Sequence, residues 1–382
     1  MELRNTSLRE LISSLGVVFV ILLLFIPIIQ DNIVKPRLYD GTINNLGRYS
    51  FTFDAYQYIS EESDNAVIGI GSSKMREIFD GRMISNLTEF DGDYYNLGYA
   101  EDRPYVRMIE LQAMIAASPK LMIIEVGPNT FSELDDTGII QYEDAFNHFA
   151  SINPYWNNVS WEHVIQESDK EILKLSRFDQ ITHYGSYGPV AIEESFLREY
   201  ENKTQQWQCG PEWPGRVQCV PLQGDQEYDY DVYLQYPTQF GNLIQRIQKW
   251  DDPMTIEEFY GGALDDYRQL TYHNPENVLN ANQLAFEHIL ETLIKENIPV
   301  LLVGLPYNPN LLQKLSHEQW GYYNSSLQVY SQMEGVSYTN FLWDERWTED
   351  NFNDYTHASR IGEIKFAELI SLDIDRILLV EA

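Results

Sequence analysis

The sequence is poor in basic residues and in cysteine, and each shortage excludes a class of protein. Only 26 Lys and Arg stand against 58 Asp and Glu, which gives a formal net charge of −32. A surface that binds nucleic acid needs a basic stripe to neutralise phosphates, so no DNA or RNA partner is expected. Two cysteines are too few for a disulfide-dense small scaffold or a four-cysteine zinc site.

Sequence patterns for cofactors and metals are also missing. Neither a Gly-x-Gly-x-x-Gly fingerprint nor a P-loop occurs, which disfavours a nucleotide-binding α/β domain. Six of the seven histidines show no metal-ligand spacing, and the seventh is taken up below. Acidic residues alternate over residues 225–231, but the glycine and terminal Glu of an EF-hand loop are absent, which favours a solvated acidic loop over a calcium site. We therefore predict neither a metal nor a cofactor.

One long apolar run lies near the N-terminus. Residues 11–29 contain no charged side chain, and about 20 such residues cross the hydrocarbon core of a bilayer. No small-residue cleavage signature follows, which favours an uncleaved signal anchor over residues 11–30, with residues 1–10 cytoplasmic and residues 31–64 as a tether. A buried core helix is the alternative. With an anchor, the protein is a single-pass membrane protein whose main domain is extracytoplasmic.

The two cysteines agree with an oxidising compartment. Cys209 and Cys219 bracket a short loop with two prolines and two glycines, so we predict a disulfide between them, with two unrelated thiols as the alternative. Four Asn-x-Ser/Thr sequons permit glycosylation without showing it; they begin at Asn86, Asn158, Asn202 and Asn324.

Short apolar runs alternate with helical stretches in two parts of the chain. The expected strands are residues 66–71, 93–97, 121–126, 298–304 and 335–340. The expected helices are residues 74–86, a stretch from residue 104, and residues 281–296, 310–333 and 358–372. This alternation predicts a three-layer α/β/α domain over residues 65–130 and 281–382, with a roughly five-stranded parallel, flavodoxin-like sheet.

The pattern breaks between these two parts. Residues 131–280 have few aliphatic runs and many Trp and Tyr, and we interpret them as an insertion that caps the carboxyl edge of the sheet. The aromatic rings could stack on sugars or form the core of the cap itself.

Small polar residues follow the first three strands, and a histidine precedes the last helix. They are Gly71-Ser72-Ser73, Asn96-Leu97-Gly98, Gly127-Pro128-Asn129 and Asp354-Tyr355-Thr356-His357. In a parallel sheet, ligands bind beyond the carboxyl ends of the strands, so these residues should meet. Serine, glycine, asparagine and histidine in this order resemble the SGNH (GDSL-like) hydrolase family, over roughly residues 64–130 and 281–372.

The residues suit acyl transfer. Ser73 is the expected nucleophile, His357 the base that takes its proton, and Asp354 the group that orients the imidazole. The backbone N–H groups of Ser73 and Gly98 and the side-chain amide of Asn129 are the expected oxyanion hole.

The Gly-Ser-Ser sequence departs from the commonest Gly-Asp-Ser motif of the family. It looks like the variant of membrane-anchored members similar to alginate O-acetyltransferases and the teichoic-acid D-alanylation protein. Ser72 is the alternative nucleophile. The alternative is that these residues have structural roles only. The serines would then form a strand-to-helix turn with a helix cap, Asn129 would be a turn or cap residue, and His357 would make a structural hydrogen bond.

The resemblance implies an esterase or O-acyltransferase that acts on an acylated carbohydrate or lipid. The acidic surface disfavours an anionic polymer as substrate, which leaves neutral acylated sugars or small esters. The alternative is an inactive SGNH-like protein, anchored at the surface, that binds glycan or supports the envelope. The sequence does not define the oligomeric state.

Overall fold

We describe the protein from a computed structural model. It describes residues 12–18, 20, 25, 28, 46–98, 102–131, 281–312, 317–353 and 356–380. The helices are α3 (Leu46–Glu62), α4 (Ser73–Ile78), α5 (Gly81–Leu87), α6 (Pro104–Arg107), α7 (Leu111–Ala117), α14 (Ala281–Lys295), α15 (Pro309–Leu312), α16 (His317–Tyr330) and α17 (Arg360–Val380). The strands are β1 (Ala66–Ile70), β2 (Asp93–Asn96), β3 (Leu121–Val126), β4 (Val300–Gly304) and β5 (Val336–Asn340). Short 3-10 helices are η2 (Met108–Glu110), η3 (Pro128–Phe131) and η10 (Glu349–Asn351).

The five strands form one parallel sheet with the order β2-β1-β3-β4-β5. This is the flavodoxin-like order, and it confirms the predicted α/β class. The chain reverses its direction of progress across the sheet between β1 and β3. Ligands of open α/β sheets bind beyond the carboxyl ends of the strands at such a switch point, so the loops after β1 and β3 are the place to look for a site.

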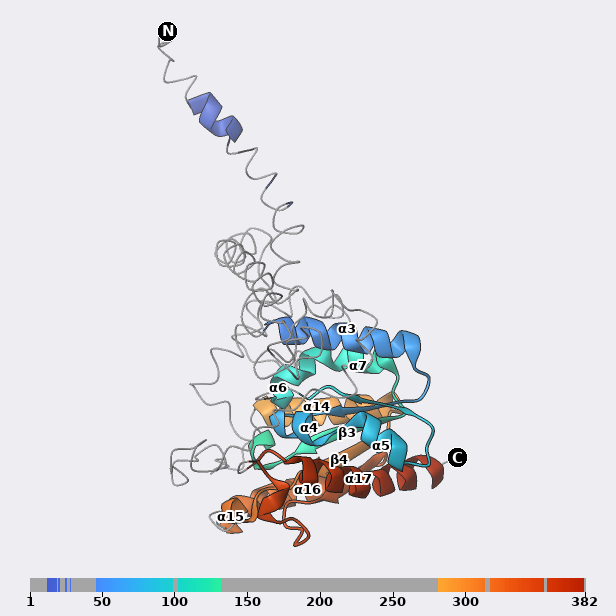
Figure 1. Cartoon of the computed structure of the whole chain (residues 1–382). Coiled ribbons are helices and arrows are strands. Elements are labelled where there is room, and N and C mark those ends of the chain that lie inside the picture. The colour runs from blue at the N-terminus through green and yellow to red at the C-terminus, as the bar shows by residue number, and fades with distance from the viewer. Residues whose placement is uncertain are drawn as a thin grey trace, which may run out of the picture.

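Helices cover both faces of the sheet, as continuous apolar strands require. On one face, Ile68 and Ile124 pack with α3, α7, α14 and α16. On the other, Val67 and Ile123 pack with α4, α5 and α17. Figure 1 shows α3 and α7 side by side on one side of the sheet and α17 along the opposite side. Successive strand residues thus point to opposite helical layers.

The first crossover differs from the expected single helix over residues 74–86. It consists of two short helices, α4 and α5, separated at Phe79 and Asp80. The Asp80 carboxylate accepts hydrogen bonds from the backbone N–H groups of Arg82 and Met83, and so caps the start of α5. This cap starts a new helix at a point where the apolar spacing alone predicted one continuous helix.

Part of the predicted tether belongs to the folded domain. Within residues 31–64, α3 spans Leu46–Glu62, and Ala55, Tyr56 and Ile59 are buried against the sheet's helical layer. Its polar and aromatic sequence carries too little apolar periodicity to predict a core helix.

The C-terminal part follows the prediction with shifted boundaries. The expected helix over residues 310–333 comprises α15 and α16, and residues 313–316 between them lie outside the described residues. The fifth strand is confirmed as β5. The last helix, α17, begins at Arg360 and runs on to Val380, past the expected end at residue 372.

Three predicted features, the insertion, the disulfide and the membrane anchor, fall wholly or largely on residues that the structure does not describe. Residues 132–280 lie outside the described residues, as do both cysteines. The apolar run over residues 11–30 is described only at positions 12–18, 20, 25 and 28. In the described part of the chain, no helix combines the length and hydropathy needed to span a bilayer.

Candidate active site

Ser73 and His357 lie in hydrogen-bonding contact at the carboxyl edge of the sheet. Ser73 is the first residue of α4, which follows β1 directly, and its Oγ lies 2.8 Å from Nε2 of His357. The two residues are 284 positions apart in the sequence. With the ring proton on Nδ1, Nε2 accepts the hydroxyl proton of Ser73, which is the arrangement that a general base needs.

A closed loop presents His357. An isolated antiparallel bridge joins Phe352 to Ala358, and the N–H of Asn353 donates to the His357 carbonyl over 2.9 Å. At the base of the loop, the N–H of Ser359 donates to the Asn351 carbonyl over 2.8 Å. Asp354 belongs to this loop but lies outside the described residues, so its role as the orienting carboxylate stays a prediction.

Ser72 faces a different partner. Its hydroxyl lies 2.8 Å from Oε2 and 3.0 Å from Oε1 of Glu125, a residue of β3. The same hydroxyl accepts the Lys74 N–H and caps α4. The helix cap and the contact to His357 are thus divided between adjacent serines, with the cap at Ser72 and the histidine contact at Ser73.

Glu125 is the centre of a buried charged cluster beside Ser73. The Nζ of Lys74 lies 2.9 Å from Glu125 Oε1, donates to the Tyr307 hydroxyl over 2.5 Å, and sits 4.5 Å from the centre of the Tyr307 ring. Burial would lower the pKa of Lys74, but Glu125 and Tyr307 outweigh burial and raise that pKa above its ordinary value. Burial would raise the pKa of Glu125, but Lys74 and the Ser72 hydrogen bonds outweigh burial and lower it. Both side chains are therefore charged at neutral pH.

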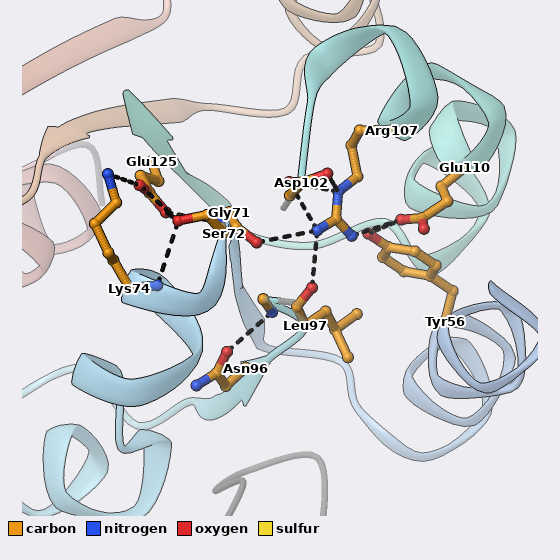
Figure 2. A network of polar contacts seen from close by, with 11 residues as sticks. Tyr56, Gly71, Ser72, Lys74, Asn96, Leu97, Asp102, Arg107, Glu110 and Glu125 are labelled. Carbon is orange, nitrogen blue, oxygen red and sulfur yellow. Dashed lines mark hydrogen bonds and ion pairs between the residues drawn. The ribbon is translucent and has the colours of Figure 1, made fainter. Parts of the chain in front are cut away.

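A second buried network lies on the opposite side of the loop after β1. The Arg107 guanidinium donates to the Asp102 carboxylate over 2.9 Å and to Glu110 over 2.8 Å. One of its nitrogens, Nη2, also donates to the backbone carbonyls of Leu97 at 3.1 Å and Gly71 at 3.4 Å. Arg107 therefore joins the loops that follow β1 and β2. Figure 2 shows this network and the Glu125 cluster on either side of Gly71 and Ser72.

The expected oxyanion-hole donors are placed unequally. No acceptor among the described residues takes the Ser73 N–H. The Gly98 N–H donates to Oδ1 of Asn96 over 3.0 Å, so it could bind an oxyanion only by sharing or exchanging that bond. Asn129 lies in η3, directly after β3, but its side chain is outside the described part of the structure.

The contacts of Asn96 leave no room for a side chain at position 98. The buried Asn96 amide donates to the carbonyls of Arg76 at 2.8 Å and Phe79 at 2.7 Å, which ties the end of β2 to α4. Gly98 then lies so close to α4 that an added Cβ would be 2.7 Å from the Arg76 backbone nitrogen. Any larger residue at position 98 would push the loop away from Ser73.

Sequence reasoning missed the buried charges around the serines. A signal for Glu125 was present, since it interrupts the otherwise apolar strand of residues 121–126, and a carboxylate in a buried strand needs a partner. Nothing comparable marks Arg107, whose partners come from the loops after β1 and β2 and from its own helical segment.

No protein-family model matches this chain, and neither does any curated protein. Within the described residues, no group of three or more His, Cys, Asp or Glu side chains is arranged to hold a metal ion.

Proposed function

We propose that the protein is a membrane-tethered, extracytoplasmic serine esterase or O-acyltransferase of the SGNH type. The observation that supports this most directly is the 2.8 Å contact between Ser73 Oγ and His357 Nε2 at the carboxyl edge of a 2-1-3-4-5 sheet. A serine hydroxyl is a weak nucleophile until a base takes its proton, and this contact supplies the base. Asp354, in the loop that holds His357 but outside the described residues, is the proposed orienting carboxylate.

The proposed reaction has two half-steps. Ser73 Oγ attacks the acyl carbonyl carbon while His357 takes the hydroxyl proton, and the carbonyl oxygen becomes an oxyanion. The oxyanion is bound by the Ser73 N–H and, as proposed donors, the Gly98 N–H and the Asn129 amide. The intermediate then collapses, the bond to the alcohol breaks, and His357 returns the proton to the leaving oxygen.

The second half-step decides between esterase and transferase. Water attacking the acyl-serine gives a carboxylic acid, whereas a sugar hydroxyl gives a new ester. In both cases His357 takes the proton of the attacking hydroxyl and returns it to Ser73. The outcome depends on whether the site excludes water and holds an acceptor, a property of the residues that surround Ser73.

The proposed location and substrate rest on the sequence. The apolar run of residues 11–30 serves as the anchor, the Cys209–Cys219 disulfide fits the extracytoplasmic side, and the aromatic insertion of residues 131–280 forms a cap. The charge of −32 favours a neutral acylated carbohydrate or lipid as the substrate.

A fluorophosphonate probe tests the proposal, because it bonds covalently only to an activated serine. The full-length chain in mild detergent should be labelled, with the adduct mapped to Ser73 by peptide mass spectrometry. Ser73→Ala should abolish the adduct. Ser85→Ala, which changes an exposed serine of α5, should leave the labelling rate unchanged.

Absence of labelling together with absence of acetyl-ester hydrolysis in the wild-type protein would refute the enzyme. That result would favour the alternative, a surface-anchored SGNH-like binding or envelope-structural protein without turnover. An adduct mapped to any residue other than Ser73 would refute the proposed site.

A further inference from the structure

The peptide group between Gly71 and Ser72 is held at both of its ends by buried charges. Its carbonyl oxygen accepts from the Arg107 guanidinium at 3.4 Å. Its N–H, which belongs to Ser72, donates to Oε2 of Glu125 at 2.7 Å. A cation thus faces the oxygen and an anion faces the N–H, the arrangement that both dipole ends of a peptide prefer. Figure 2 shows the two charged groups on opposite sides of this peptide.

Because residue 71 is a glycine, the backbone there can rotate freely unless other groups hold the peptide between Gly71 and Ser72, as a clamp would. Position 71 has φ +156, and a Cβ there would lie 2.5 Å from Cβ of Glu125. The position therefore requires glycine, the residue with the fewest limits on backbone rotation. Rotation at Gly71 would swing the peptide that leads into Ser72 and carry the Ser73 hydroxyl away from His357.

With Lys74 in place, Glu125 satisfies both the Ser72 N–H and the ammonium only as a carboxylate. A charged carboxylate offers acceptors on both oxygens and no donor. Oε2 accepts the Ser72 N–H, while Oε1 lies 2.9 Å from Nζ of Lys74. Glu125 is 7% exposed, so without a cation its charge would be costly to bury. Lys74 supplies that cation.

We propose that Glu125 is a positioning residue for Ser73. It acts by accepting the Ser72 N–H, and Lys74 acts by keeping Glu125 ionised. This inference rests on the proposed function, since it assigns Glu125 to the same reaction. Glu125 does not touch the reacting atoms; its effect is to hold the Ser73 hydroxyl within reach of His357.

Two charge-neutral double variants provide the matched comparison. Lys74→Met/Glu125→Gln keeps an amide oxygen that can accept the Ser72 N–H, and the vacated lysine site leaves room for the amide NH2. Lys74→Met/Glu125→Met has nearly the same size and charge but no acceptor. The positioning role predicts that the Gln variant labels Ser73 at least about tenfold faster than the Met variant, since misplacement by about 1 Å can cost 10²-fold.

The single variant Glu125→Gln adds a rescue test. With Lys74 still present, the amide must direct its NH2 either at the Ser72 N–H or at the lysine ammonium, so one donor faces another. Labelling should therefore slow by about 10- to 100-fold. Adding Lys74→Met should restore much of the rate. Because removal of the unpaired ammonium also restores stability, the two rates are compared only if both variants show the folded circular dichroism spectrum of the wild type.

The measurements are the second-order rate of fluorophosphonate labelling and the far-UV circular dichroism of each full-length variant in the same detergent. Equal labelling rates for the folded Gln and Met double variants would overturn the inference. So would a slow Glu125→Gln variant that Lys74→Met fails to rescue. If the wild-type protein is not labelled, the proposed function itself fails, a result separate from either of these.

Discussion

Removal of the Arg107 guanidinium should destabilise the fold strongly. The side chain is 2% exposed and contacts two buried carboxylates, Asp102 at 9% and Glu110 at 0% side-chain exposure. Met has a similar length and no charge, so Arg107→Met leaves both carboxylates without their cation. It also removes the donor to the carbonyls of Gly71 and Leu97.

The size of the effect follows from the interactions that the substitution removes. Removing one partner of a buried ion pair costs about 3–5 kcal/mol. Each buried carbonyl that loses its donor adds about 1–3 kcal/mol. We therefore expect Arg107→Met to lower the free energy of unfolding by at least about 5 kcal/mol, comparable with the whole stability of many domains, which is about 5–15 kcal/mol. The triple variant Arg107→Met/Asp102→Asn/Glu110→Gln should recover much of this lost free energy of unfolding, because it removes the uncompensated charges.

The pH dependence of the stability difference between wild type and Arg107→Met gives a second, independent test. Burial raises the pKa of Asp102 even with Arg107 opposing it, and without the guanidinium this pKa rises further. A carboxyl with a raised folded-state pKa destabilises the protein above its unfolded-state pKa of about 4, and the penalty disappears below that pH. The stability gap between wild type and Arg107→Met should therefore be widest near pH 7 and narrow as the pH falls toward 4.

The loss of unfolding free energy and its pH dependence are measured by urea unfolding of the full-length chain in detergent, followed by far-UV circular dichroism at several pH values. A loss of less than about 1 kcal/mol at pH 7 would show that the Arg107 ion pairs contribute no more than exposed ones do. A gap that stays constant between pH 7 and pH 4 would refute the reasoning, because the cost would then not arise from ionised carboxylates.

Three further predictions concern the site and the anchor. His357→Ala should slow fluorophosphonate labelling by about 10²–10⁴-fold; a folded His357→Ala variant that is labelled at the wild-type rate would exclude His357 as the base. Gly98→Ala places a Cβ 2.7 Å from the Arg76 backbone nitrogen and should cost about 1–3 kcal/mol of stability while slowing labelling; an unchanged urea midpoint and rate would show that the loop tolerates a side chain. Deletion of residues 1–30 should give a soluble, folded protein by gel filtration and circular dichroism, and aggregation would indicate that the apolar run packs in the core.

The three central strands were predictable because they are short, apolar and separated by helical stretches. β1, β3 and β4 are buried along their whole length and leave a continuous hydrophobic signal. The outer strands β2 and β5 are more polar, but they too appear within a residue or two of their expected places. The helices were less predictable. The break between α4 and α5 depends on the Asp80 cap. The helix α3 is stabilised by tertiary contacts of Tyr56 and Ile59, which its sequence pattern does not predict.

The proximity of Ser73 and His357 could be anticipated, because parallel strands bring their carboxyl ends to one edge. The surrounding support could not. Arg107 and Glu125 act on backbone groups of other segments, and pairings of that kind leave no spacing rule in a single sequence. The same holds for the Asn96 amide, whose Oδ1 accepts the Gly98 N–H that the sequence analysis assigns to the oxyanion hole.

The points where the chain leaves and rejoins the sheet lie beside each other. Phe131, the last described residue after β3, packs edge-on against Phe286 of α14, with ring centroids 5.1 Å apart. Asn282, at the start of α14, accepts the Tyr105 N–H over 3.2 Å. The domain thus closes across this junction on its own, and each doubling of the intervening length costs only about 0.6 kcal/mol in loop-closure entropy. The two described segments that flank residues 132–280 are therefore held together at the edge that carries Ser73 by contacts within the described domain itself. If the proposed function is correct, a change of substrate specificity at this edge would not require the sheet to be rebuilt.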